Sequence, residues 1–226
     1  MKTALLYNGD KPEARLAASQ LSEKGYRILS VKAEEMTEEA WKEQEEHALD
    51  LLVLCPDTDF GQQDNAAGTG RDYDALAAFI ADRIYDIHAC MQRCIPMLEK
   101  GEDKRIVILT RACSSINWCR DTADFAGHMI LTGVNMQAKL LFNRLHPQGF
   151  TVRCYAGADG NSGRYADGDA TCSTQRKNVT ETTRAGGIGP GEYALLDFCY
   201  DAGEPAVHSD ENRLVMRDRF YREIAW

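Results

Sequence analysis

The sequence of 226 residues contains no apolar run near the roughly 20 residues that are needed to cross a bilayer. Met1-Lys2 leads directly into a short apolar run, without the long apolar region or small-residue cleavage site of a secretory signal. Basic residues are also scarce: 26 Lys and Arg stand against 35 Asp and Glu, which gives a formal net charge of −9. No basic stripe offsets this charge, which argues against a nucleic-acid or anionic-membrane partner. We therefore expect a cytoplasmic protein without a membrane span.

The eight cysteines include no Cys-x-x-Cys pair. Several fall inside apolar strand or helix patterns, where a reduced cysteine packs as a small hydrophobe. This usage favours a reducing compartment. Cys90 and Cys94 could share a helix face, but two thiols without a nearby histidine pair make a poor metal site. We therefore predict no bound metal.

What the sequence does contain is an alternation of short β-type runs and helical stretches from end to end. The strands are expected at residues 3–7, 26–31, 51–55, 106–109, 150–155 and 213–216. The helices are expected at residues 12–24, 37–47, 73–98, 123–145 and 192–200. Polar, glycine-bearing stretches at 60–71 and 157–191 are typical of loops. Strands that alternate with helices predict an α/β fold with a doubly wound parallel sheet, and the absence of repeats or long linkers predicts one domain over residues 1–226.

From Leu49 onward the order and spacing of these elements resemble the short-chain dehydrogenase/reductase (SDR) family. The matching features are an Asp-plus-apolar strand (Asp50 to Cys55), a long helix ending in Ile95-Pro96-Met97, a strand Arg105 to Leu109, a helix opening at Phe125, and a strand Phe150 to Arg153 closed by Ala156-Gly157. The resemblance implies a Rossmann-like three-layer α/β/α domain of about six strands, and in that family an oxidoreductase that uses NAD(P).

The family's glycine-rich first turn is altered. The motif Thr-Gly-x-x-x-Gly-x-Gly falls on residues 7–14, where Asn8, Gly9 and Asp10 follow the first strand and none of the three aligned glycines remains. Those glycines let the backbone approach a pyrophosphate at the helix N-terminus. Here Asp10 and Glu13 are typical of a capping box, which predicts a self-capped helix end that repels phosphate. The family's Asn-Asn-Ala-Gly is likewise replaced, by residues 54–57.

The family's catalytic Tyr-x-x-x-Lys aligns with Phe125 and Met129. The tyrosine exchanges a proton with the substrate oxygen and the lysine lowers its pKa, and neither replacement can do so. The only Tyr-x-x-x-Lys runs from Tyr7 to Lys11, at the end of a different strand. The family's serine aligns near Ala112 or Cys113.

Residues 32–50 are too few for the family's second helix and one edge strand, so we predict a sheet trimmed at the cofactor edge. The altered glycine-rich turn, Asn-Asn-Ala-Gly motif, catalytic pair and cofactor edge predict a pseudoenzyme. Such a protein would be a non-catalytic binding or assembly subunit with no nicotinamide cofactor. Helices 73–98 and 123–145, which form the dimer interface in the resembling family, predict a homo-oligomer or a complex with an active SDR paralogue.

Two alternatives stay open. One is an enzyme with other chemistry in the crevice at the strand carboxyl ends, where Arg111 would clamp an anion and His128 would act as a base. Its further candidates are Cys113, Ser114, Ser115, Asn8 and Asp10, with Asp159 from the loop after the fifth strand. The other is an atypical NAD(P)-dependent oxidoreductase, which would require the cofactor after all.

Overall fold

The computed structural model describes residues 1–35, 37–59, 73–119, 124–156, 212–217 and 223–226. These residues form one sheet of six strands in the order β2-β1-β3-β4-β5-β6, and all neighbouring strands run parallel. The strands are β1 (Thr3–Tyr7), β2 (Arg27–Val31), β3 (Leu51–Leu54), β4 (Arg105–Leu109), β5 (Thr151–Tyr155) and β6 (Met216–Arg217).

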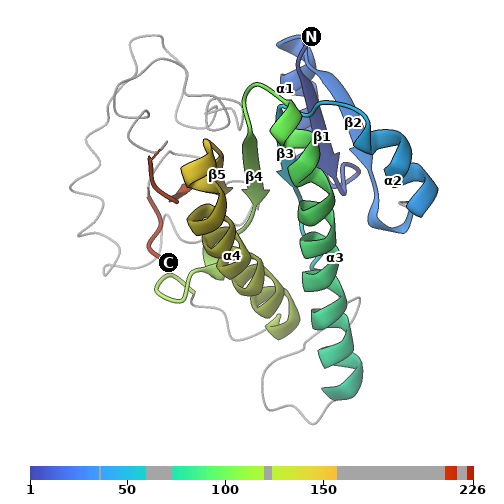
Figure 1. Ribbon diagram of the computed structural model, residues 1–226. Helices are drawn as coiled ribbons and strands as arrows, with labels where there is room; N and C mark the ends of the chain where they lie inside the picture. Colours follow the sequence, from blue (N-terminus) through green and yellow to red (C-terminus); the bar gives the residue numbers. More distant parts are fainter. Residues whose placement is uncertain (36, 60–72, 120–123, 157–211, 218–222) are drawn as a thin grey trace.

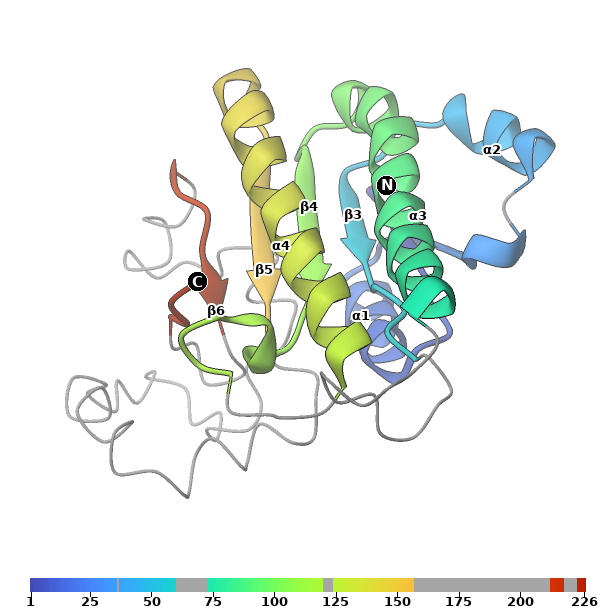
Figure 2. The same ribbon diagram turned by 90° about the horizontal axis from the view of Figure 1, so that it is seen from below.

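Helices cover both faces of the sheet. They are α1 (Pro12–Glu23), α2 (Glu38–Glu45), α3 (Tyr73–Lys100) and α4 (Phe125–Leu145). The long helices α3 and α4 lie side by side on one face, and α1 lies on the other (Figures 1 and 2). Parallel strands joined by helical crossovers require this layered arrangement.

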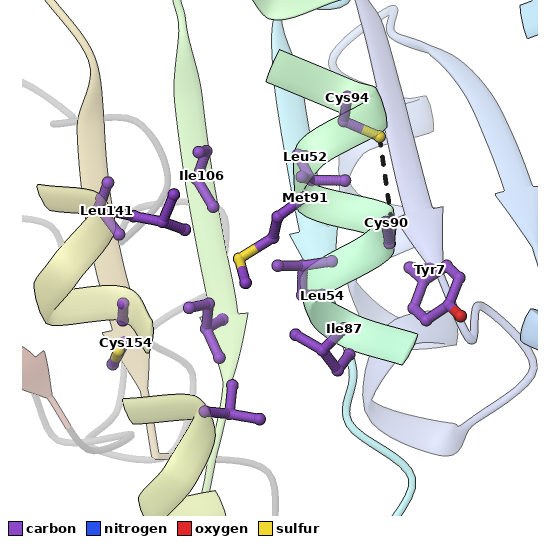
Figure 3. Packing of buried hydrophobic residues seen from close by; sticks show 14 of the residues in the cluster. Tyr7, Leu52, Leu54, Ile87, Cys90, Met91, Cys94, Ile106, Leu141 and Cys154 are labelled. Atoms are coloured by element: carbon purple, nitrogen blue, oxygen red, sulfur yellow. Dashed lines mark hydrogen bonds between the residues drawn. The ribbon is translucent and has the colours of Figure 1, made fainter. Parts of the chain in front are cut away.

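The central strands are apolar throughout because both of their faces are buried. Successive side chains point to opposite faces, so Leu52 and Leu54 pack against α3 while Leu51 and Val53 pack toward α1. Met91 of α3 fills the space between these strands and α4 (Figure 3). Every residue of β1 and β3 is therefore buried in the core on one face of the sheet or the other.

The predicted fold class is confirmed. β2 is the outermost strand beside β1 within the described sheet, and only a 3-10 turn (Ala33–Glu35) and α2 separate it from β3. Trp41 anchors α2 to α3, where the Arg93 guanidinium lies 5.7 Å from the indole ring centre. The trimmed edge that the short spacing predicted is thus present.

Several boundaries differ from the prediction. The last strand covers Met216–Arg217 rather than residues 213–216, and α3 continues to Lys100 despite Pro96. The predicted helix at 192–200 and the loops at 60–71 and 157–191, with Asp159, lie outside the described residues. No helix in the described part of the chain is long and apolar enough to span a membrane.

Candidate functional site

The candidate site lies at the carboxyl end of β1, between the two strands that flank it. β2 pairs with one edge of β1 and β3 with the other, so the carboxyl end of β1 is a topological switch point, the usual ligand crevice of such sheets. A pocket of about 110 Å³ opens here. Its walls include Tyr7, Asn8, Lys11, Asp57, Arg83 and Asp86, which come from the ends of β1 and β3, the start of α1 and the amino-terminal half of α3.

Asn8 joins the three strand ends at this point. Its Nδ2 donates to the Cys55 carbonyl oxygen over 2.9 Å, and its Oδ1 accepts from the Ala33 amide over 3.3 Å. The residue adopts the left-handed conformation, with φ of 56°, which asparagine tolerates better than most residues. The position aligned with the first glycine of the SDR turn thus keeps a left-handed backbone, but its side chain fills the space at the strand ends.

Gly9 lies close to β2. A Cβ at this position would lie 2.0 Å from the Ser30 Oγ, so a larger residue would require the exposed Ser30 side chain to rotate away. The turn after β1 therefore lies directly against the edge strand.

An ion-pair network crosses the pocket. Lys11 Nζ lies 2.7 Å from Asp57 Oδ1, and Asp57 Oδ2 lies 3.7 Å from Arg83 Nε. Arg83 also pairs with Asp86, at 3.3 Å, and its guanidinium stacks over the Phe79 ring. The network links the start of α1 to β3 and α3 through alternating charges.

These contacts fix the protonation states. The hydrogen bond to Asp57 raises the pKa of Lys11 above its ordinary value. Burial alone would raise the pKa of Asp57, but the hydrogen bond and charge of Lys11 outweigh burial and lower it. Lysine and aspartate are therefore both charged at neutral pH. Burial, with the nearby Asp82 carboxylate, raises the pKa of Asp86.

The start of α1 is not capped as predicted. The N-cap residue is Lys11 rather than Asp10, and its side chain makes no cap hydrogen bond. Pro12 occupies the first helical position, where its missing N–H costs nothing. The capping-box prediction is wrong because proline fixes where the helix begins, and Asp10 remains exposed one residue earlier.

Tyr7 and Lys11, the only Tyr-x-x-x-Lys in the sequence, both line the pocket. Burial, with smaller effects from Cys90 and Asp86, raises the pKa of the Tyr7 phenol. Tyr7 lies beside Cys90 at the edge of the core cluster (Figure 3). A phenol with a raised pKa is a poor acid, and Lys11 is engaged by Asp57, so this pair does not reproduce the SDR acid–base arrangement.

Arg111 lies at the same edge of the sheet, after β4. Its Nη2 donates to Thr58 Oγ1 over 2.6 Å, and its Nη1 lies 3.4 Å from Asp124 Oδ2. Asp124 caps α4 through the Gly127 amide, and its carbonyl oxygen lies 2.6 Å from His128 Nδ1. The structure thus brings Arg111 and His128 together through Asp124.

The serine and cysteine candidates are buried. The Ser114 hydroxyl donates to the Arg111 carbonyl oxygen over 2.7 Å and accepts from Asn135 Nδ2 over 2.8 Å. Ser115 donates to the Ala225 carbonyl oxygen. Cys113 is also buried. Both hydroxyls therefore hold the loop after β4 in place.

Phe125 and Met129 occupy the first two turns of α4 and are 36% and 46% exposed. Neither side chain exchanges a proton or carries a charge. The described residues contain no group of three or more metal-ligating side chains.

The sequence did not predict the Lys11–Asp57–Arg83 network. Asp57 follows the strand-ending Pro56, and Arg83 occupies the third turn of a long helix, a placement that is usual for solvated charges. Only the position of Lys11 just after β1 indicated a functional residue. The sequence pointed to it through its spacing from Tyr7, which says nothing of its ion-pair partner Asp57.

Comparisons with solved structures agree with this fold. A carbonyl reductase from Pseudomonas aeruginosa PAO1 in complex with NADP is 9% identical, with 100% of both chains covered and a TM-score of 0.64. A protein from Burkholderia multivorans assigned to the short-chain dehydrogenases/reductases, with bound NADP, is 13% identical, with 100% of this chain and 99% of that chain covered and a TM-score of 0.62. BdcA in complex with NADPH is 15% identical, covering 69% of this chain and 70% of that chain with a TM-score of 0.51.

At such identities the likeness shows the fold alone: the chain has the Rossmann-like fold of the short-chain dehydrogenases/reductases. A scan against protein-family models found no match. A search of curated proteins found no relative either.

Proposed function

We propose that this chain is a binding subunit built on the SDR fold that does not perform the family's hydride transfer. The observation that carries the proposal is the Lys11–Asp57 pair, 2.7 Å apart, which spans the pocket at the switch point. The volume of about 110 Å³ that remains is small beside the roughly 300–1,000 Å³ of typical ligand pockets.

The residues present also do not fit a dinucleotide chemically. Asp10, Asp57 and Asp86 line the pocket beside Lys11, Lys32 and Arg83, so the lining offers a pyrophosphate no net positive charge. Phe125 and Met129 supply neither the proton nor the charge that hydride transfer to a carbonyl requires at this position. Both the cofactor half and the catalytic half of the crevice are therefore altered.

A second candidate is an NADP(H)-dependent oxidoreductase with unfamiliar catalytic residues. It is favoured by the NADP and NADPH present in structures of similar fold. Lys11, Lys32 and Arg83 also place three cations in the pocket, and phosphate binds such groups. It requires Lys11 to leave Asp57 when the cofactor enters.

Titration of the protein with NADPH separates the two candidates. Because three carboxylates line the pocket and Lys11 is paired with Asp57, we expect no change in nicotinamide fluorescence and no thermal shift at millimolar NADPH. Saturable binding at micromolar NADPH would overturn the binding-subunit proposal and support the oxidoreductase.

The partner proposed for this subunit is a second copy of the chain, joined through the outer faces of α3 and α4. Met136 and Leu140 of α4 are 60% and 62% exposed, and Tyr85 of α3 is 70% exposed. The α4 sequence contains no Asp or Glu and carries Lys139 and Arg144, whereas α3 exposes Asp74 and Asp82. In a two-fold pair, basic α4 would face the acidic half of the other copy's α3. An active SDR paralogue is the other partner that this surface suits.

We expect Leu140→Glu to convert an oligomer to monomers, because it would place a carboxylate within each apolar contact. Light scattering after gel filtration measures the change. The matched control is Leu16→Glu on α1, which is 56% exposed on the opposite side of the sheet and should leave the mass unchanged. A wild-type chain that stays monomeric at high concentration would refute self-association.

A further inference from the structure

The charges that line the switch-point pocket are balanced. Its three cations are Lys11, Lys32 and Arg83, and its three carboxylates are Asp10, Asp57 and Asp86. A ligand with a single charge would attract half of these groups and repel the rest. A ligand that carries one positive and one negative group would exchange partners with an existing ion pair and leave the number of paired charges unchanged.

Lys11 and Asp57 are the pair best placed for such an exchange. Their side chains are about one third and one quarter exposed, so both reach the pocket and solvent. Each stabilises the charged form of the other, so an ammonium and a carboxylate face the pocket at neutral pH. Asp86 and Lys32 lie on the same walls and offer a second carboxylate and a second ammonium.

The rest of the lining limits the size and polarity of the ligand. Ile87 and Ala33 contribute a small apolar area to the lining, and Tyr7 also lines the pocket. The volume of about 110 Å³ is well below that of typical ligand pockets, which favours a small molecule.

We propose that this pocket binds a small zwitterion, an α-amino acid of the size of glycine, alanine or serine. The carboxylate replaces Asp57 as the partner of Lys11 and reaches Lys32, and the ammonium group pairs with Asp57 and Asp86. This inference rests on the proposed function, because it requires a crevice that does not hold a dinucleotide.

Isothermal titration with glycine, alanine and serine tests the proposal, with acetate and methylammonium as single-charge probes. We expect saturable binding of at least one amino acid and binding of each single-charge probe that is weaker by about tenfold or more. Asp57→Asn and Lys11→Met should each weaken amino-acid binding by about tenfold or more, since each removes a charge-assisted contact.

The matched control is Asp103→Asn. Asp103 pairs with Lys2 over the same 2.7 Å, but at the start of β1 rather than at its end. This variant should bind amino acids as the wild type does. Absence of amino-acid binding to the folded wild-type protein would overturn the inference, as would equal affinity for acetate or unchanged binding by both pocket variants.

NADPH titration of the same samples keeps the two proposals apart. If the protein binds neither amino acids nor NADPH, the proposed function stands and only the zwitterion site is refuted. If it binds NADPH at micromolar concentration, both the proposed function and the zwitterion site are refuted.

Discussion

Replacing Asp50 by alanine is expected to lower the free energy of unfolding by about 3 kcal/mol. Asp50 is buried, and its two carboxylate oxygens accept from the Thr3 amide over 2.8 Å and from the Glu102 amide over 2.9 Å. These bonds tie the start of β1 to the turn that enters β4. Charge-assisted bonds of this kind contribute about 1.5–3 kcal/mol each, and the exposed Glu102 amide recovers part of its loss by bonding water.

Chemical denaturation measures this loss, and a fall in melting temperature of about 6–12 °C should accompany it. The control is Asp103→Ala, which removes a partly exposed ion pair with Lys2 and should cost less than about 1 kcal/mol. Asp50→Asn should fall between the two, because the amide keeps one acceptor oxygen. Equal losses for Asp50→Ala and Asp103→Ala would contradict the role given to Asp50.

Gly101→Ala is expected to cost about 2–3 kcal/mol, since overpacking a rigid contact has a cost of this order. A Cβ at this position would lie 1.9 Å from the Leu49 carbonyl oxygen and 2.6 Å from the Leu49 carbonyl carbon. Both are backbone atoms at the entry to β3 and cannot rotate away. The end of α3 would have to move relative to the sheet.

Gly133→Ala in α4 is the matched control for this substitution. Its Cβ would approach only the side chain of Ile84, at 2.7 Å from Cδ1 and 3.4 Å from Cγ1, and this side chain is flexible at its far end. Alanine also favours a helix over glycine by about 1 kcal/mol. We therefore expect an unfolding free energy equal to or above that of the wild type. Equal unfolding free energies for Gly101→Ala and Gly133→Ala would contradict the close packing described between the end of α3 and Leu49.

The fold followed from the sequence because its signals are local and repeated. Continuous apolar runs such as Leu51–Leu54 predict strands buried on both faces, and the short interval from Val31 to Leu51 predicts the missing edge strand. The boundary errors have physical causes. Pro96 does not end α3, since the helix is packed against the sheet and α4 strongly enough to tolerate one lost hydrogen bond.

The site was harder to predict from the sequence because its contacts join residues that are distant in the chain. Lys11 and Asp57 are 46 residues apart, and nothing in either neighbourhood specifies the other. Conversely, the candidates Ser114 and Ser115 were chosen for their hydroxyls, whose buried hydrogen bonds to Arg111 and Ala225 only the tertiary structure shows. Arg111 lies at the strand ends as its position after β4 suggests, and its chemical role stays a prediction.

The amide of Asn8 has a consequence for the order in which the chain folds. Its two partners lie 25 and 47 residues away, at the ends of strands on either side of β1. The bond to Ala33 forms only once β2 has paired with β1, and the bond to Cys55 only once β3 has, because loop closure must precede such distant contacts. The Asn8 bonds therefore belong to the last stage at which the amino-terminal half becomes native, and a substitution there should speed unfolding while leaving the rate of folding nearly unchanged.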